Sequence, residues 1–215
     1  MNIAIIGAGN IGTGFARRLL ASNHGIVLAD IDAAKATAAA QEAGGSSGRV
    51  QSAPLEAAIA QAEIVVLAVP FSASEVIAGG QAAQLAGRIV VDVTNPLTPD
   101  FMGLTLGFDT SAAERIAALL PGARVVKGFN TIFAQIHHDA RGGAFGDRRA
   151  QALLASDDAQ AKSAVAALAE VMGYEPVDAG PLANARFIEP LAALNIQLGY
   201  ALGRGTQIAP AWLAR

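Results

Sequence analysis

The sequence contains no cysteine, which removes several kinds of chemistry from consideration. Disulfide bonds, thiolate catalysis, iron–sulfur clusters and cysteine-ligated zinc all require that residue. Its absence also fits a cytoplasmic protein, which is the compartment we expect. Charge is scarce as well, because charged residues make up 15% of the 215 positions and the formal net charge is −3. This balance gives no electrostatic reason to expect binding to nucleic acid or to an anionic membrane.

Long apolar runs are also missing. No stretch approaches the roughly 20 apolar residues of a membrane-spanning helix, and the N-terminus lacks the basic residues of a signal peptide. Hydrophobic residues nevertheless reach 53%, a value inflated by alanine, which suits a well-buried α/β core. We therefore expect one large domain with an extension rather than several domains.

The first fourteen residues carry the motif on which the functional interpretation of the chain depends. Residues 2–6 are a short β-branched run that predicts a buried strand, and a G-x-G-x-x-G motif and an apolar helical pattern follow at once. Gly7 allows a tight turn, Gly9 lets a pyrophosphate approach the backbone, and Gly12 lets the helix pack against the strand. The free N–H groups at the start of the helix then face the phosphates. We predict that a dinucleotide contacts the whole turn, namely Gly7, Ala8, Gly9, Asn10, Ile11 and Gly12.

A second strand, residues 25–30, ends on an acid at about the spacing expected of a ribose ligand. The Asp30 carboxylate can accept hydrogen bonds from both adenosine ribose hydroxyls, and it repels a 2′-phosphate at short range. Because Lys35 is the only nearby cation, this local chemistry prefers NAD to NADP, and Ile31 belongs to the same predicted site. The alternative role for Asp30 is to cap the helix predicted over Ala33–Glu42, which Asp32 fills equally well.

Strands and helices continue to alternate, which predicts an α/β fold with a Rossmann-type, doubly wound parallel sheet. Ligands sit beyond the carboxyl ends of such strands. The apolar strands over residues 63–69 and 88–93 therefore add Ala68, Val69, Pro70 and Asn95 to the predicted cofactor site. For Asn95, which precedes a proline, simple turn chemistry is an equally open interpretation. The glycine- and serine-rich residues 44–48 predict a flexible loop.

The C-terminal third carries one more βαβ pattern, over residues 151–178, which predicts an extension of the sheet. A final helix is expected from Leu182 to about Leu202. Its apolar stripe consists of Phe187, Leu191, Leu194, Leu198 and Leu202. The stripe packs either on its own sheet or on a partner subunit. We divide the chain into a dinucleotide-binding domain, residues 1–178, and a C-terminal helix and tail, residues 179–215.

Acid–base groups are scarce near the predicted strand ends. Lys127 and Asn130 have the spacing of a hydroxyacid dehydrogenase pair, but that pair lies on a helix, so we expect Lys127 to be a solvated strand-end lysine. His137 and His138 are adjacent and diverge, so we predict no metal site. No catalytic residue is predicted. Reduction of a carbonyl usually needs a proton donor, whereas hydride transfer to a second flat redox ring needs mainly stacking and orientation.

Five motifs occur in an order that resembles the deazaflavin (coenzyme factor 420)-dependent NADP oxidoreductase family. They are GAGNIG (7–12), VVLAVPF (65–71), VVDVTNPL (90–97), VVKGFNTI (125–132) and DAGPLANARFIEPLAAL (178–194). The reductase domain of six-transmembrane metalloreductases is similar too. The resemblance implies a nicotinamide cofactor, a flat hydride acceptor near Asn95, Asn130 and Thr131 under the segment that begins at Pro181, and a homodimer formed through the terminal helix. NADP-binding members have serine and basic residues after the second strand, where this chain has Asp30 and Asp32.

Three hypotheses follow. The first is an oxidoreductase that passes hydride from NAD or NADP to a flavin or deazaflavin co-substrate without a dedicated acid or base. The second is a non-catalytic dinucleotide-binding module, such as a redox sensor. The third is an imine or carbonyl reductase, which would need a proton donor, and Thr131 and Tyr200 are the candidates.

Overall fold

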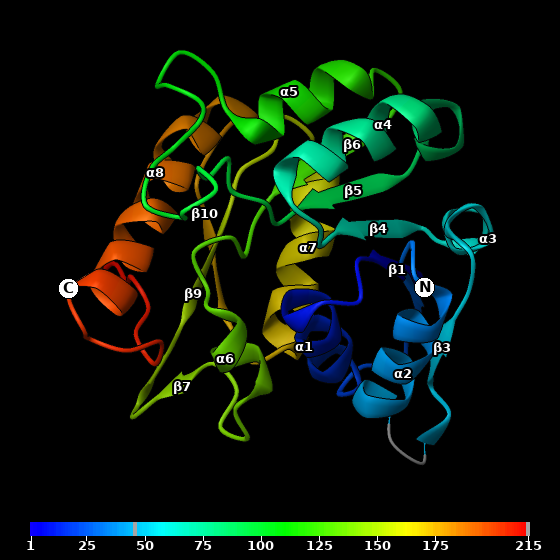
Figure 1. Cartoon of the computed structure of the whole chain (residues 1–215), viewed down its shortest axis with the longest axis horizontal. Coiled ribbons are helices and arrows are strands. Elements are labelled where there is room, and N and C mark those ends of the chain that lie inside the picture. The colour runs from blue at the N-terminus through cyan, green and yellow to red at the C-terminus, as the bar shows by residue number, and fades with distance from the viewer. Residues whose placement is uncertain (45–46, 214–215) are drawn as a thin grey trace.

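The computed structural model describes residues 1–44 and 47–213, so residues 45–46 of the loop predicted over 44–48 lie outside it. A six-stranded parallel sheet has the order β3-β2-β1-β4-β5-β6 (Figure 1). Its strands are β1 (Asn2–Ile6), β2 (Gly25–Ala29), β3 (Val50–Ser52), β4 (Ile64–Leu67), β5 (Ile89–Asp92) and β6 (Arg124–Lys127). The order reverses at β1, which is where doubly wound sheets bind dinucleotides. The predicted fold class is confirmed.

Helices cover both faces of this sheet. They are α1 (Asn10–Leu19), α2 (Ala33–Gly44), α3 (Leu55–Gln61), α4 (Phe71–Leu85), α5 (Ala112–Leu119), the short α6 (Ala134–His138) and α7 (Ala159–Val171). Alternate residues of β1 enter two separate cores, with Ile3 and Ile5 on one face and Ala4 and Ile6 on the other. Because side chains alternate along a strand, burial on both faces explains why the strands are continuously apolar.

The second βαβ unit differs from the prediction. Strands β9 (Gln151–Leu154) and β10 (Glu175–Asp178) form their own two-stranded parallel sheet instead of extending the main one. A single antiparallel bridge, Lys127 to Ala155, joins the two sheets at the ends of β6 and β9. The short hairpin of β7 (Ala144–Phe145) and β8 (Arg148–Arg149) precedes this unit.

The terminal helix has three parts. A 3-10 turn (Leu182–Asn184) leads into α8 (Ala185–Ile196), which continues as a π-helical turn (Gln197–Ala201). Figure 1 shows α8 at the opposite end of the long axis from α2 and β3. Ile188 and Ala192 face the protein, whereas Phe187 and Leu194 of the predicted stripe are exposed. No helix in the described part of the chain is both long and apolar enough to cross a membrane.

Candidate functional site

The glycine turn between β1 and α1 is shaped by close backbone contacts. Gly7 has φ +111°, and a Cβ there would lie 2.4 Å from the carbonyl oxygen of Ala68. A Cβ on Gly12 would lie 1.8 Å from the carbonyl oxygen of Gly7, so both positions require glycine. A Cβ on Gly9 would meet nothing within 4 Å. Gly9 is the N-cap of α1, and no described side chain caps the helix there. The first-turn amides therefore have open space in front of them, as a pyrophosphate requires.

Asp30 follows β2 and is bonded directly to this turn. Its Oδ2 accepts a hydrogen bond from the Ala8 N–H at 2.8 Å, and its Oδ1 accepts one from the Asp32 N–H at 3.1 Å. Lys35 Nζ lies 3.1 Å from Oδ2. Burial raises the pKa of Asp30, but the hydrogen bonds from Ala8, Asp32 and Lys35 outweigh it and hold that pKa below its usual value. Asp32 caps α2, since its Oδ1 accepts from the N–H groups of Ala34 and Lys35.

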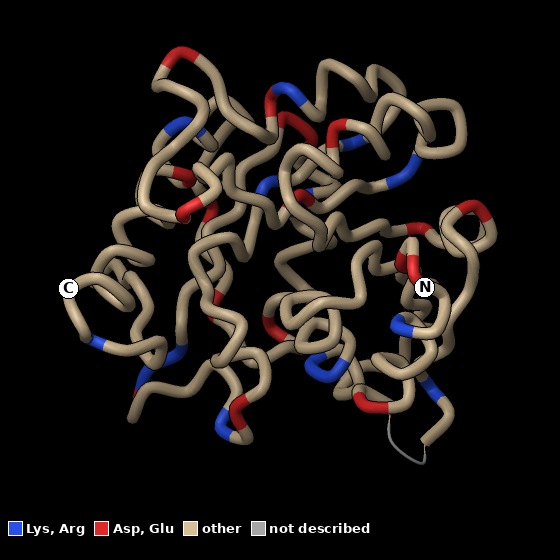
Figure 2. The backbone as a smooth tube through the Cα atoms, viewed as in Figure 1, with Lys and Arg blue, Asp and Glu red and all other residues tan. Residues whose placement is uncertain are grey.

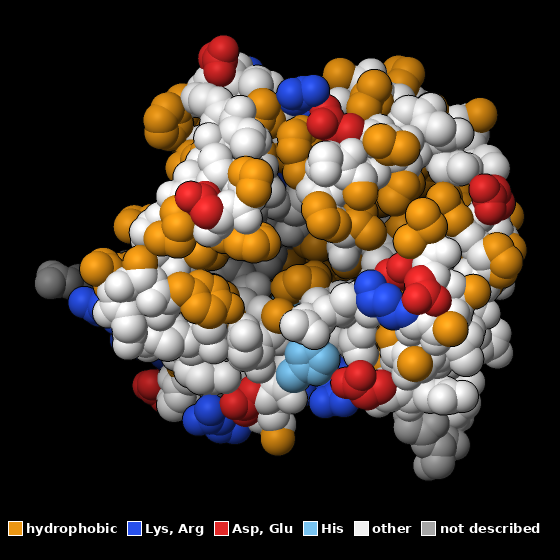
Figure 3. Space-filling view, in the orientation of Figure 1, with side chains coloured by type: hydrophobic (Ala, Val, Ile, Leu, Met, Phe, Trp, Pro, Cys, Tyr) orange, Lys and Arg blue, Asp and Glu red, His pale blue; other side chains and the backbone are white. Residues whose placement is uncertain are grey.

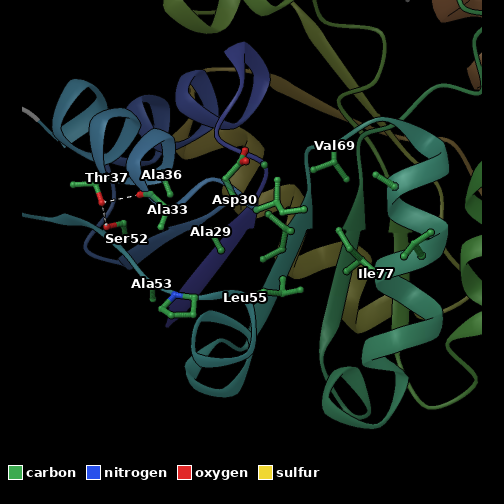
Figure 4. A pocket seen from close by; sticks show the side chains of 16 residues that line it. Ala29, Asp30, Ala33, Ala36, Thr37, Ser52, Ala53, Leu55, Val69 and Ile77 are labelled. Atoms are coloured by element: carbon green, nitrogen blue, oxygen red, sulfur yellow. Dashed lines mark hydrogen bonds between the residues drawn. The ribbon is translucent and has the colours of Figure 1, made fainter.

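A first chamber of about 820 Å³ opens beside the turn, between α2 and α4 (Figure 4). Its walls are mainly aliphatic, with Leu55, Val69 and Ile77 among them. The hydroxyls of Thr37 and Ser52 lie 3.0 Å apart on one wall. The chamber also includes Gly7, Asp30 and Ile31, and Ile31 is fully exposed at its edge. An apolar slot with a carboxylate at its inner end suits an adenine ring and its ribose.

A second chamber of about 540 Å³ lies on the other side of the turn, where Ile11 and Val93 line it. Asn95 and Asn130 form one wall: Asn130 Nδ2 donates to Asn95 Oδ1 at 2.8 Å, and Asn95 Nδ2 donates to the carbonyl of Asn130 at 3.0 Å. Asn130 Oδ1 and Thr131 Oγ1 are buried without a hydrogen-bond partner among the described atoms. Because unpaired buried polar atoms are costly, these two are suited to receive a ligand.

Charged side chains do not gather in one place in the views of Figures 2 and 3. Figure 3 shows a hollow at the centre of the molecule, bordered mainly by hydrophobic and uncharged side chains. Figure 2 shows Lys, Arg, Asp and Glu interspersed along the chain, with no basic face in that view. Of the residues that line the second chamber, Asp100 and Tyr200 are the titratable ones.

The expectation of a solvated lysine at position 127 is wrong. Lys127 is fully buried, and its Nζ lies 2.9 Å from Asp92 Oδ2 and 2.9 Å from Glu189 Oε1. Burial lowers the pKa of Lys127, but the two carboxylates together raise it above its usual value. Glu189 also accepts from the N–H groups of Ala112 and Ala113 at the start of α5. This ion triad joins β5, β6 and α8.

The adjacent histidines do diverge. His137 is buried, with its Nδ1 2.6 Å from the hydroxyl of Tyr174, and burial, with smaller effects of His138 and Arg18, lowers the pKa of His137 to about 3. His138 Nε2 lies 2.8 Å from the carbonyl oxygen of Asn10. The described residues contain no cluster of three His, Asp or Glu able to hold a metal ion.

The structure brings most of the predicted site residues together, with one clear exception. Gly7, Asp30, Ile31 and Val69 line the first chamber. Ile11, Asn95, Asn130 and Thr131 line the second. Ala8, Gly9, Asn10 and Gly12 belong to the turn, Ala68 packs against Gly7, and Pro70 is the N-cap of α4. Pro181 lines neither chamber, because Gly180 (φ +87°) turns the chain away and Asp157 holds the N–H of Leu182.

The fold, the turn and the acidic strand end define a Rossmann-type dinucleotide-binding fold. Residues 2–96 match the family described as NADP oxidoreductase, coenzyme F420-dependent. The F420-dependent NADP reductase of Methanothermobacter marburgensis is 34% identical over 210 residues, which cover 92% of each chain. This chain belongs to that family. The predictions of the family and of an NAD(P)-dependent oxidoreductase are confirmed.

Two further comparisons agree. A solved structure from Arthrobacter sp. FB24, described as a candidate F420-dependent NADP reductase, has a TM-score of 0.81 and 31% identity, and the match covers 97% of this chain and 99% of that one. Rattus norvegicus metalloreductase STEAP3 is 32% identical over 190 residues, which are 88% of this chain but 36% of the relative.

Proposed function

We propose that the protein transfers hydride between a nicotinamide dinucleotide and a flat flavin or deazaflavin co-substrate. The observation that carries this proposal is the pair of chambers beside the glycine turn and the start of α1, because Gly7 lines the first chamber and Ile11 lines the second. A dinucleotide that lies with its adenosine in the first chamber and its pyrophosphate over Gly9 extends its nicotinamide toward Val93 and Asn95, the near wall of the second.

The residues of the chain bind and orient, and the two rings supply the redox chemistry. The amides of the first turn of α1 hold the pyrophosphate. Ile11 and Val93 give the second chamber apolar walls, while Asn130 Oδ1 and Thr131 Oγ1 offer partners to the polar edge of the acceptor. Hydride passes between stacked rings, and such a step depends mainly on proximity and orientation.

The direct test follows NADH or NADPH absorbance in stopped flow, with riboflavin, 8-hydroxy-5-deazariboflavin and a ferric chelate as separate acceptors. We expect oxidation with at least one flavin-type acceptor. Oxidation with none of the three would overturn this function and leave the non-catalytic dinucleotide-binding module and imine or carbonyl reduction as the alternatives.

Cofactor choice gives a second prediction. Asp30 lines the first chamber and Asp32 follows two residues later at the start of α2, so we propose that NADH binds more tightly than NADPH, by roughly tenfold. In Asp30→Asn, which keeps an acceptor oxygen for the Ala8 N–H, the preference is expected to fall to within about threefold. Fluorescence titration with both nucleotides measures this, and Asp109→Asn, an exposed acid outside the first chamber, is the control. Tighter binding of NADPH to the unmodified protein would contradict the role of Asp30.

Imine or carbonyl reduction remains the second candidate function. Thr131, whose hydroxyl is unpartnered, and Tyr200 both line the second chamber and are positioned as proton donors. This function would be favoured over the first by two results together. The protein would oxidise NADH with a cyclic imine but not with flavins, and Thr131→Val or Tyr200→Phe would abolish the imine reaction.

We also propose a homodimer through α8 that acts in the cytoplasm. Phe187 and Leu194 of α8, and Leu202 just after the π-helical turn, are 67%, 54% and 68% exposed, and a second copy could cover these apolar side chains. Light scattering during gel filtration is expected to give a dimer for the unmodified chain and a monomer for Leu194→Glu. Val171→Glu, at an exposed apolar position on α7, is the control and is expected to stay dimeric. A monomeric unmodified chain would refute the dimer.

We also propose that the chain divides into a dinucleotide-binding domain, residues 1–178, and a C-terminal helix and tail, residues 179–215.

A further inference from the structure

Backbone strain in this protein is concentrated at the second chamber. Among the described residues, the non-glycine residues with positive φ are Phe101 (φ 61°) and Phe129 (φ 60°). Both line the second chamber. A bulky side chain is rarely found in this left-handed region, because Cβ approaches the backbone. Strain of this kind persists where the surrounding structure enforces it, and it gathers at functional sites.

The two phenylalanines use their rings differently. Phe129 is 2% exposed, and its ring packs edge-on against Phe15 and Tyr174 with centroid distances of 4.8 and 6.2 Å. Its ring therefore contributes to the core. Phe101 is 64% exposed at the edge of the chamber. Burial of its ring therefore explains little of why this strained conformation is kept.

Neighbouring groups hold Phe101 in place through their own hydrogen bonds. Thr98 is central: its carbonyl accepts the N–H of Phe101 at 2.8 Å, its Oγ1 accepts the N–H of Gly103 at 2.9 Å, and its N–H donates to the Gly103 carbonyl at 2.9 Å. Asp100 Oδ1 accepts the N–H of Met102 at 3.0 Å. Gln197, in the π-helical turn after α8, donates to the carbonyl of Met102 at 2.7 Å. The loop is thus fixed from both ends, and these contacts do not depend on the ring of Phe101.

We propose that Phe101 is an acceptor-binding residue whose ring stacks on the outer face of a flat aromatic co-substrate in the second chamber. This inference rests on the proposed function, since it assumes that the chamber takes the acceptor. The inner wall carries the amide of Asn130 and the hydroxyl of Thr131, which bind the edge of a ring. The flat ring of Phe101 supplies the stacking contact with the face of that ring, which these polar groups do not provide. Aromatic stacking tolerates different ring systems, so the residue selects flat acceptors over aliphatic ones.

The test uses the quenching of riboflavin fluorescence, and 8-hydroxy-5-deazariboflavin as a second probe, with the protein saturated with NAD⁺. Phe101→Gly removes the ring and suits the left-handed backbone, so its urea midpoint is expected to be unchanged or higher. The Kd for the flavin probe is expected to rise about tenfold, while that for NADH stays within about twofold. Phe101→Asn, a non-aromatic residue that tolerates positive φ, is expected to behave like Phe101→Gly, and Phe101→Trp is expected to retain binding.

The binding readout separates this inference from the proposed function. Tight, ring-dependent binding without NADH oxidation would overturn hydride transfer but support the stacking role. Unchanged probe affinity in Phe101→Gly and Phe101→Asn would overturn the stacking role even if the unmodified enzyme turns over. Failure of both probes to bind the unmodified protein would overturn it as well.

Discussion

Gly9→Ala is expected to fold normally and to lose at least about a hundredfold in affinity for NADH. A Cβ at this position meets no protein atom within 4 Å, so the substitution costs the folded chain little. The open space lies at the N-terminus of α1, where a pyrophosphate must approach the backbone amides. A methyl group there holds the phosphates away from the N–H groups, and a hundredfold loss corresponds to about 2.7 kcal/mol. Isothermal titration with NADH measures the affinity, and circular dichroism checks the fold.

Two other glycine substitutions serve as matched controls. A Cβ on Gly79, in α4, also meets nothing within 4 Å, and the position is exposed. Gly79→Ala is therefore expected to bind NADH normally and to gain about 0.5–1 kcal/mol of stability, because alanine favours the helix. Gly12→Ala would place its Cβ 1.8 Å from the Gly7 carbonyl oxygen and is expected to disrupt the fold itself. Normal NADH affinity in a folded Gly9→Ala would show that the dinucleotide does not lie on this turn.

Local patterns were sufficient to predict the main sheet, because its central strands β1, β4 and β5 are buried on both faces and its helices are bounded by turn signals. The same signals predicted strands at β9 and β10 but assigned them to the wrong sheet. Their sequences read as ordinary buried strands, but whether a strand joins an existing sheet depends on the free edge it meets. At β6 that edge contributes a single bridge, Lys127 to Ala155. The direction in which the chain leaves Gly180, which takes Pro181 away from the second chamber, is likewise a tertiary property.

The candidate site was predictable where its chemistry follows from sequence spacing. The glycine turn and Asp30 are of this kind, but the hydrogen bond from the Ala8 N–H to Asp30 joins residues 22 apart and left no local signal. Lys127 was misread because lysine is seldom fully buried. Its partner Glu189 lies in a helix 62 positions later, so the ion triad could not be predicted from local sequence and required the three-dimensional structure. The positive φ of Phe101 had no signal in the sequence, since phenylalanine is not typical of that conformation.

Lys127→Met is expected to cost about 3–5 kcal/mol of unfolding free energy. Asp92, Lys127 and Glu189 have side chains that are 0%, 0% and 2% exposed. Removal of the ammonium group leaves two carboxylates buried without their cation. Glu189 keeps the N–H groups of Ala112 and Ala113, and Asp92 keeps the N–H of Thr94 at 2.9 Å. These bonds place the cost near the lower end of the range.

Urea unfolding of single and combined variants can separate the charge from the volume of the lysine. Lys127→Met combined with Asp92→Asn removes one of the two stranded charges and is expected to recover at least about 1 kcal/mol. Lys162→Met is the matched control, because Lys162 pairs with Asp178, whose side chain is 68% exposed, and such pairs contribute about 0–1 kcal/mol. An unfolding midpoint for Lys127→Met equal to that of Lys162→Met would contradict a structural ion triad. Because Lys127 also donates to the carbonyl of Thr94 at 2.5 Å, next to Asn95, its loss is expected to weaken ligand binding in the second chamber as well. The triad would then set the wall of the second chamber as well as the stability of the sheet.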